Sequence, residues 1–370
     1  MRPRTNFIKR KKRYTEIEAS KCIMAMTKLI IIASGGTGGH VFPAVCLANE
    51  LKQRGYDILF ATDRRGIKYL GEYTNTAIIQ HLSTSSRLKL YLSLVLNIIK
   101  YFFKIVLLRP KLVIGFGGYP SVPFVLIAQI LRIKTAIHEQ NAVIGKANTI
   151  LARKATIIAA SFPDTKKLLY AQKAKCVGNP TRFENLYGKT KQQKNGSFTI
   201  LIFGGSQGAK VFSGVIVDAI CEFAKTKSIK IFHQGRKQDI EKIKQAYTNA
   251  GIDGVVQDFF NNIDELYQQS DVIISRSGAS SVFEIIGFRK PAILVPYGNS
   301  INGDQLENAK FLENHDACTV ILENELSTEK LLNALMNIQD KSKQISENLR
   351  RIRINDPVKR FADYIEETIQ

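Results

Sequence analysis

The chain has 370 residues, of which 45% are hydrophobic and 23% charged, enough apolar sequence for two folded domains and too much for a disordered protein. Its 53 basic and 32 acidic residues give a net charge of +21, so we expect an anionic partner. An anionic membrane ranks above nucleic acid, because no basic and aromatic nucleic-acid motif is present and tryptophan is absent. Five scattered cysteines without a C-x-x-C pair argue against a disulfide framework or zinc site and favour a reducing compartment.

The apolar stretches give no sign of export or of a membrane span. No run of about 18 uninterrupted apolar residues occurs, and no signal-peptide pattern opens the chain. Residues 1–27 hold eight basic and two acidic residues, and we interpret them as a disordered basic extension. Met24 and Met26 lie just before the first apolar run, so a start codon assigned too far upstream is the alternative.

A glycine-rich turn follows the first apolar run. Leu29 to Ala33 is mostly β-branched, as in a strand buried on both faces, and apolar residues recur at helical spacing from Val41 to Leu51. The turn "GGTGGH" between them would aim free backbone N–H groups and a helix N-terminus at one point, which suits a phosphate or pyrophosphate. The spacing is not G-x-G-x-x-G, and Asp63 is the only acid near a ribose position. A dinucleotide site is therefore the second choice, and a turn without a ligand remains open.

The same strand, glycine pair and helix pattern returns at residues 111–130 and 198–220, and further short apolar runs alternate with helical stretches. This predicts an α/β protein of two Rossmann-like domains whose parallel sheets face a cleft. We place the domains at residues 28–180 and 198–357, with a polar linker at 181–197. A final helix over 358–370 has the option of packing back on the first domain.

Residues 87–109 predict a helix with an unusual surface. Lys89, Ser93, Asn97, Lys100 and Lys104 recur at spacings that place them on one stripe, and the remainder is nearly apolar. Two lysines in its second half argue against a membrane span. An interfacial helix with a basic stripe and a core helix with lysines reaching water both remain open, and the net charge favours contact with anionic lipid.

In the second half, "RSGASSVFE" joins a strand to a helix through a turn able to bind phosphate. Glu284, early in that helix, either accepts hydrogen bonds from ribose hydroxyls or complements the helix dipole, and the residues alone favour the dipole. No D-x-D pair occurs, so a divalent ion held by paired aspartates is not expected, and helix ends and basic side chains would meet a diphosphate.

Seven motifs in order carry a family resemblance. They are "GGTGGHVFPA" (35–44), "GFGGYPSVP" (115–123), "HEQN" (138–141), "GNPTR" (178–182), "GGSQGA" (204–209), "RSGASSVFE" (276–284) and "DQLENA" (304–309). From about Lys28 to the C-terminus the chain resembles the bacterial N-acetylglucosaminyltransferases that convert lipid I to lipid II in peptidoglycan synthesis. Residues 1–27 fall outside the resemblance.

The resemblance implies the glycosyltransferase B fold, UDP-N-acetylglucosamine as donor, undecaprenyl-linked lipid I as acceptor, and an inverting transfer that makes a β-1,4 linkage. No metal and no cofactor are expected, in line with the missing D-x-D pair. The resemblance also implies a peripheral protein on the cytoplasmic face of the inner membrane, and an association with other cell-wall synthesis and division proteins is an option. Lys89, Lys100 and Lys104 would then contact the membrane, since family members carry an apolar patch ringed by basic residues in this region.

Site residues follow by motif position. The donor site would comprise Thr37, Gly38, Gly39, Asn141, Arg182, Ser206, Ala279, Ser280, Ser281, Val282, Phe283, Glu284 as the ribose acceptor, and Gln305, with Phe260 beside the uracil. The acceptor pyrophosphate would lie against Gly35, Gly36, Gly117, Gly118 and Tyr119. Asp304 replaces a glutamine of several family members, which weakens the case for a sugar contact at that position.

The candidate base is His40, because an inverting transfer needs the acceptor hydroxyl deprotonated as it attacks the anomeric carbon. His40 has two other options, to orient its loop or to bind acceptor phosphate as a cation. His138 or an acidic residue distant in sequence could also reach the cleft. A glycolipid synthase acting on diacylglycerol or sterol, an NAD-binding oxidoreductase and a basic nucleic-acid adaptor remain as alternative functions.

Overall fold

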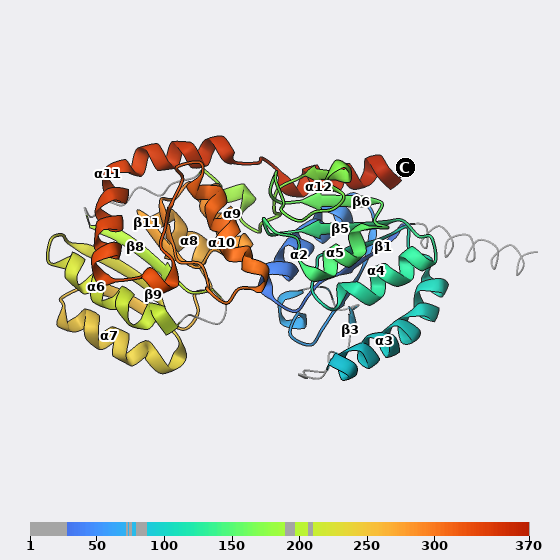
Figure 1. Cartoon of the computed structure of the whole chain (residues 1–370), viewed down its shortest axis with the longest axis horizontal. Helices are drawn as coiled ribbons and strands as arrows, with labels where there is room; N and C mark the ends of the chain where they lie inside the picture. Colours follow the sequence, from blue (N-terminus) through green and yellow to red (C-terminus); the bar gives the residue numbers. More distant parts are fainter. Residues whose placement is uncertain are drawn as a thin grey trace, which may run out of the picture.

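The computed structural model describes residues 28–71, 73, 76–78, 87–188, 197–205 and 210–369. Within these ranges the chain forms two α/β domains side by side, each built on a parallel sheet covered by helices (Figure 1). The predicted fold class, two Rossmann-like domains with parallel sheets, is confirmed. The extension at residues 1–27 and much of the polar segment between the domains lie outside the described residues.

The N-terminal sheet has the strand order β3-β2-β1-β4-β5-β6-β7. Its strands are β1 (Leu29–Ala33), β2 (Asp57–Thr62), β3 (Thr76–Ile78), β4 (Leu112–Gly115), β5 (Thr135–Glu139), β6 (Ile157–Ala160) and β7 (Ala174–Cys176), and its helices are α2 (Gly38–Gln53), α3 (Arg87–Leu108), α4 (Ser121–Ile130) and α5 (Lys146–Ala152). Alternate residues of β1 face opposite layers: Ile30 and Ile32 pack with α2, whereas Ile31 and Ala33 pack with α4. Burial on both faces explains why β1 is continuously apolar.

The C-terminal sheet has the order β10-β9-β8-β11-β12-β13. Its strands are β8 (Phe198–Phe203), β9 (Ile229–Gln234), β10 (Asp253–Gln257), β11 (Val272–Ser275), β12 (Ala292–Leu294) and β13 (Thr319–Val320), and its helices are α6 (Val215–Ala224), α7 (Ile240–Asn249), α8 (Ile263–Gln269), α9 (Ala279–Phe288), α10 (Asp304–Glu313) and α11 (Thr328–Ile352). In both sheets the first strand of the domain is central, so the loops after β1 and β8 open where the strand order changes direction, the usual ligand position in such sheets.

The last helix, α12 (Pro357–Ile369), crosses from α11 to the N-terminal domain (Figure 1). Phe361, Ala362 and Ile365 are fully buried in the layer that α2 forms on the N-terminal sheet. At its surface, Arg54, the residue that follows α2, pairs with Asp363 and Glu366, each at 2.7 Å. The C-terminus therefore ties the two domains together.

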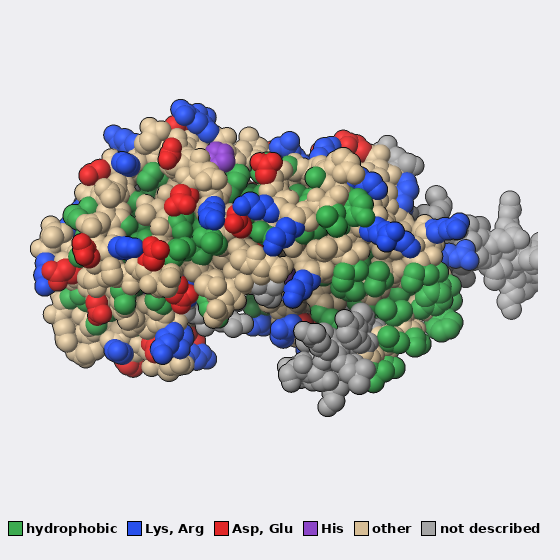
Figure 2. Space-filling model, in the orientation of Figure 1, with side chains coloured by type: hydrophobic (Ala, Val, Ile, Leu, Met, Phe, Trp, Pro, Cys, Tyr) green, Lys and Arg blue, Asp and Glu red, His purple; other side chains and the backbone are tan. Residues whose placement is uncertain are grey.

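Helix α3 buries one side and exposes a broad apolar side. Asn97, Tyr101 and Ile105 are buried, so Asn97, which the sequence placed on the polar stripe, faces inward. The exposed apolar side chains described on this helix are Leu92, Val95, Leu96, Ile99, Phe103, Val106 and Leu107. Figure 2 shows hydrophobic side chains gathered over the region of α3 and α4. Among the described residues, none of the helices combines the length and apolarity needed to cross a bilayer.

Candidate active site

Two glycine turns of the N-terminal domain pack directly on each other. The amide of Gly35, after β1, donates to the carbonyl of Gly117, after β4, at 2.9 Å. A Cβ at Gly118 would lie 2.7 Å from the Gly35 Cα, and Gly117 and Gly118 have φ angles of 78° and 73°. Only glycine permits both this backbone and this approach. Gly36 is equally confined, because a Cβ there would lie 1.9 Å from Asp63 Oδ1.

Beyond these turns lies a cavity of about 660 Å³ on the N-terminal domain, closed on one side by the start of α10. Its walls include His40, Gly117, Gly118, Tyr119, Val122, Glu139, Asn141, Lys146, Asn148, Ile150, Asn302 and Asp304. We call it the N-terminal cavity. Gly35 and Gly36 are buried behind it rather than on its wall.

Among the described residues, His40 is the one histidine that lines this wall. Its Nδ1 lies 3.1 Å from Gln140 Oε1, and Gln140 Nε2 lies 3.0 Å from His138 Nδ1. His138 is fully buried, and burial lowers its pKa to about 4. His138 therefore cannot itself reach a substrate, and of the two histidines only His40 is placed to contact one.

The two carboxylates on the same wall differ in how free they are. Glu139 is 2% exposed, and its oxygens accept bonds from the amides of Asn141 and Gly145 at 3.1 and 2.9 Å and from Asn148 Nδ2 at 2.8 Å. These three donors hold both carboxylate oxygens and fix the Glu139 side chain in place. Asp304 accepts from the Gln305 amide at 2.8 Å, and burial raises its pKa. Asp304 is thus a second candidate on this wall, beside His40, to take a proton.

A second cavity, of about 240 Å³, lies between α2 and the C-terminal domain, and we call it the junction cavity. Its walls are Gly38, Gly39, Phe42, Tyr69, Arg182, Phe203, Gly205, Gln234, Phe259, Phe260, Ile263, Gly278, Ala279, Ser280, Ser281 and Glu284. Burial raises the pKa of the Glu284 carboxyl to about 7, although Arg182 nearby acts to lower it. The Arg182 guanidinium lies over the Phe42 ring, 4.1 Å from its centre, so the cation is held at this wall.

Helix α9 starts at this cavity with polar atoms unused. The Ser280 hydroxyl is buried and has no hydrogen-bond partner among the described residues. The first-turn amides of a helix lack partners within the helix and carry the positive end of its dipole. Val282 and Phe283 were expected at the donor site, but they are 0% and 8% exposed and pack in the domain core. Helical geometry separates them from Ser280, Ser281 and Glu284, which face the cavity.

Two adjacent phenylalanines at this cavity differ in exposure. Phe260, expected beside the base, is 6% exposed and packs edge-on against Phe232 at 6.5 Å. Phe259 is 52% exposed and offers the larger free ring surface. Sequence analysis missed Phe259, since neither strand nor helix periodicity governs the turn between β10 and α8.

Three other expected donor residues, all of them described, do not line the junction cavity. Thr37 precedes α2 and is exposed, Asn141 lies on the N-terminal cavity, and Gln305 Oε1 accepts from the Tyr297 amide at 3.0 Å. Ser206 lies outside the described residues. Asp63, the candidate ribose acid of a dinucleotide site, is 2% exposed and paired with Arg65 at 2.6 Å.

Polar contacts fix the two domains around these cavities. Asn308 of α10 is fully buried, and its Nδ2 donates to Asn141 Oδ1 and to the Ser277 carbonyl, each at 3.0 Å. Its Oδ1 accepts from the Ala142 amide at 2.8 Å. One side chain therefore joins the loop after β5 to the loop before α9, and sequence analysis did not single it out.

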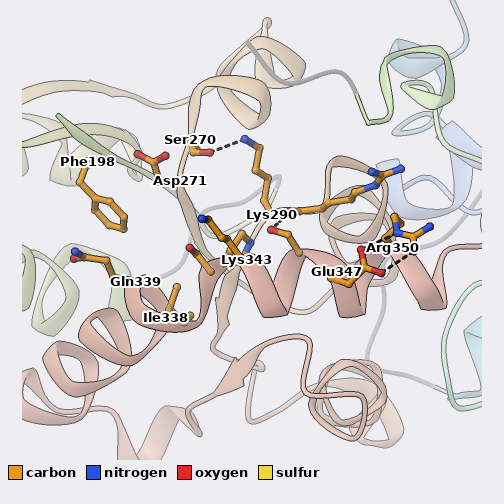
Figure 3. Close-up of a pocket in the computed structure, with 13 residues that line it drawn as sticks. Phe198, Ser270, Asp271, Lys290, Ile338, Gln339, Lys343, Glu347 and Arg350 are labelled. Carbon is orange, nitrogen blue, oxygen red and sulfur yellow. Dashed lines mark hydrogen bonds and ion pairs between the residues drawn. The ribbon is translucent and has the colours of Figure 1, made fainter. Parts of the chain in front are cut away.

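Neither cavity offers a metal seat: no group of three or more His, Cys, Asp or Glu among the described residues is placed to hold an ion. A further hollow of about 600 Å³ lies elsewhere, between α11 and the starts of β8, β11 and β12 (Figure 3). There Lys290 Nζ is satisfied by the carbonyls of Gln268 and Ser270, and Arg350 by Glu347. Because ligands of parallel sheets bind at the opposite, carboxyl ends of strands, we assign no function to this hollow.

Comparison with protein families matches the chain in two segments. Residues 30–160 match the glycosyltransferase family 28 N-terminal domain, and residues 199–366 match the glycosyltransferase family 28 C-terminal domain. The first segment covers the N-terminal sheet as far as β6, and the second covers the C-terminal sheet from Thr199 of β8 onward.

Curated relatives cover most of the chain. A protein of Wolbachia sp. subsp. Brugia malayi (strain TRS), named UDP-N-acetylglucosamine-N-acetylmuramyl-(pentapeptide) pyrophosphoryl-undecaprenol N-acetylglucosamine transferase, is 35% identical over 341 residues, covering 90% of this chain and 97% of the relative. A protein of Allorhizobium ampelinum with the same name is 38% identical over 320 residues, covering 83% of this chain and 86% of the relative.

Solved structures agree with this match. The crystal structure of Acinetobacter baumannii MurG has a TM-score of 0.77 at 26% identity and covers 92% of this chain and 99% of its own. The calicheamicin glycosyltransferase CalG4 has a TM-score of 0.69 at 14% identity over 93% of this chain and 98% of its own, a likeness of fold alone.

Proposed function

This chain belongs to glycosyltransferase family 28, and we propose that it transfers N-acetylglucosamine from UDP-N-acetylglucosamine to undecaprenyl-pyrophosphoryl-N-acetylmuramyl pentapeptide, making lipid II. The names of the two curated relatives described above support this proposal. One observation carries the assignment of substrates to sites. Gly38 and Gly39 line the junction cavity, and the next residue, His40, lines the N-terminal cavity. Adjacent residues at the start of α2 thus line different cavities, so the two cavities meet there. A transfer between two bound substrates requires sites that are this close.

The junction cavity takes the donor. Glu284 accepts hydrogen bonds from the ribose hydroxyls, and the exposed ring of Phe259, rather than Phe260, contacts the uracil. The diphosphate lies at the start of α9, where free amides, the Ser280 hydroxyl and Arg182 stabilise its charge. The same groups stabilise the negative charge that grows on UDP as it leaves, so catalysis here needs no metal.

The N-terminal cavity takes the acceptor sugar and its pyrophosphate. His40 removes the proton of the acceptor hydroxyl while that oxygen attacks the anomeric carbon, and the bond from this carbon to the UDP oxygen breaks. Attack from the side opposite the leaving group inverts the configuration and gives a β-1,4 linkage. Tyr119, Lys146 and the turn at Gly117 and Gly118 hold the pyrophosphate.

The exposed face of α3 rests on an anionic membrane on the cytoplasmic side. Ile130 at the end of α4 and Ile150 of α5 are 62% and 61% exposed, and Ile150 also lines the N-terminal cavity. The apolar surface therefore continues to the mouth of the proposed acceptor site, so a lipid-linked sugar can enter without leaving the bilayer surface. Lys100 and Lys104 lie exposed along the face and meet anionic head groups.

Radiolabelled UDP-N-acetylglucosamine, offered with a short-chain lipid I analogue, diacylglycerol or a sterol, tests this function. We expect label to enter only the lipid I analogue. Transfer to diacylglycerol or sterol instead would identify a glycolipid synthase. Labelling of no acceptor, together with fluorescence evidence of NADH binding, would favour the oxidoreductase, although the burial of Asp63 and its pairing with Arg65 argue against that function.

A further inference from the structure

We infer that Gln140 and His138 are positioning residues that hold His40 with its proton on Nδ1, so that Nε2 is the atom that accepts the proton of the acceptor hydroxyl. The inference rests on the proposed transferase function, in which His40 is the base. It starts from a hydrogen-bond chain whose inner end is buried and whose outer end lies on the N-terminal cavity.

The buried end of the hydrogen-bond chain, at His138, fixes which atoms donate and which accept along it. His138 Nε2 lies 3.1 Å from the Gly178 carbonyl, which only accepts, so Nε2 carries the proton. Ser161 Oγ, at 3.4 Å from the same nitrogen, is also able to accept. The ring is fully buried between Phe116 and Phe361, each with its centre 5.2 Å away, and no carboxylate in the described part of the chain bonds to it. A neutral ring with its proton on Nε2 leaves Nδ1 as an acceptor.

The bond to His138 fixes the orientation of the Gln140 side-chain amide. Its Nε2 faces two acceptors, His138 Nδ1 at 3.0 Å and the His138 carbonyl at 3.3 Å. The reversed amide would place its oxygen against both acceptors, so the amide has one favourable orientation. At 2% exposure, Gln140 has no water to compensate for the reversed arrangement. Its Oε1 must therefore face His40.

The orientation of Gln140 determines which ring nitrogen of His40 carries the proton. Gln140 Oε1 only accepts, so the His40 Nδ1 at 3.1 Å must donate. A neutral imidazole with its proton on Nδ1 has its lone pair on Nε2. The ring is confined between the glycine turns, since a Cβ at Gly35 would lie 2.9 Å from its Cδ2 and one at Gly117 would lie 3.3 Å from its Cε1. It therefore cannot turn over to exchange its two nitrogens without moving the turns.

An amide suits this position better than a carboxylate. A carboxylate at position 140 would stabilise the imidazolium of His40, which cannot act as a base. The charged and titratable groups that share the cavity with His40 are Tyr119, Glu139, Lys146 and Asp304, and neutral His138 lies behind it. Glu139 is already held by several donors, and Asp304, which lines the same cavity, interacts electrostatically with His40. Gln140, being neutral, adds no charge that would favour the imidazolium, and it fixes the tautomer of His40.

Nitrogen-15 NMR of the full-length protein labelled at histidine tests the tautomer without any turnover. His40→Asn identifies the His40 signals by their loss. At mildly alkaline pH, we expect the bound proton on Nδ1 and an unprotonated Nε2. A His40 ring with its proton on Nε2 would overturn the inference, even if the protein is a transferase. Absence of transfer by the wild type would instead overturn the proposed function.

Two variants test the consequence for catalysis. Gln140→Met should let His40 populate the other tautomer and lower kcat by roughly ten- to a hundredfold, at or below the low end of a general-base contribution, with little change in the donor KM. Gln140→Glu should move the acid limb of kcat/KM to higher pH by about one unit or more, because the new carboxylate favours the imidazolium.

Gln129→Met provides the matched control. The Gln129 amide also donates to a buried carbonyl of this domain, that of Leu151 at 2.9 Å, but it lies away from both cavities. It should share any loss of stability and keep the wild-type pH profile and kcat. If folded Gln140→Glu keeps the wild-type acid limb, or folded Gln140→Met keeps the wild-type kcat and His40 tautomer, the positioning role is refuted.

Discussion

Glu284 gives a prediction in which a carboxylate with a shifted pKa controls the affinity for the donor. Burial raises its pKa to about 7, so it is partly protonated at neutral pH in the unliganded protein. Ribose hydroxyls can donate to both oxygens of the ionised carboxylate. The protonated carboxyl group carries an O–H donor on one oxygen and accepts fewer of these hydrogen bonds. We therefore expect the KM for UDP-N-acetylglucosamine to rise as the pH falls through 7. Between pH 8 and pH 6 the ionised fraction, and with it the apparent affinity, falls roughly tenfold.

Substitution should separate this effect from the rest of catalysis. A hydrogen bond to a charged group contributes about 1.5–3 kcal/mol, so Glu284→Ala should raise the donor KM by roughly ten- to a hundredfold. The acceptor KM should change little, because the lost contact is to ribose in both the ground and transition states. Glu284→Gln should show a raised donor KM that no longer depends on pH between 6 and 8.

Steady-state transfer at several pH values, with the donor varied and the acceptor saturating, measures these constants. Glu241→Gln is the control, because Glu241 lies exposed on α7 and pairs only with Lys244 at 3.1 Å. If Glu284→Ala lowers only turnover and leaves the donor KM unchanged, the ribose assignment is wrong. If Glu284→Gln keeps the wild-type pH dependence of the donor KM, another group is responsible for it.

Three further predictions follow from the same structure. EDTA should leave substantial transferase activity, and complete loss that magnesium restores would reveal a metal site that this account lacks. Lys100→Glu combined with Lys104→Glu should weaken binding to anionic vesicles by about 1 kcal/mol or more per site at moderate salt and spare activity on a soluble acceptor. Lys343→Glu, on α11, is the control. Unchanged vesicle binding by the folded double variant would place the membrane face elsewhere. Phe361→Ala should destabilise the protein by about 3–5 kcal/mol in urea unfolding, because the ring is fully buried in the N-terminal domain. Met336→Ala, at an exposed methionine, is the control and should have little effect. Equal stability of both variants would mean that α12 does not hold the domains together.

The parallel α/β architecture was predictable because the pattern that encodes it is local. Leu29–Ala33 and Phe198–Phe203 are short apolar runs followed by glycine turns, and both became central strands. Helix α3 was predicted to within a residue of its end. The burial of Asn97 was not predicted, because spacing places residues on a common stripe but does not say which stripe faces the neighbouring helix.

The candidate site was predictable at the level of motifs and less so at the level of side chains. His40, Arg182, Ser280 and Glu284 lie on the two cavities, as the motifs indicated. Val282 and Phe283 belong to the same motif, yet one helix cannot turn all its residues to one cavity. Long-range contacts were out of reach: the bond from Asn308 to Asn141 spans 167 residues, and no periodicity links them.

The central claim is that both substrates meet at the start of α2 and react in a single displacement with His40 as base. The anomeric configuration of the product tests this most directly. Proton NMR of the disaccharide released from the lipid product of the wild-type enzyme reports the coupling between H1 and H2 of the transferred sugar. We predict the large coupling of a β linkage, formed by inversion of the α-linked donor. The small coupling of an α linkage would contradict direct attack and with it the assigned role of His40.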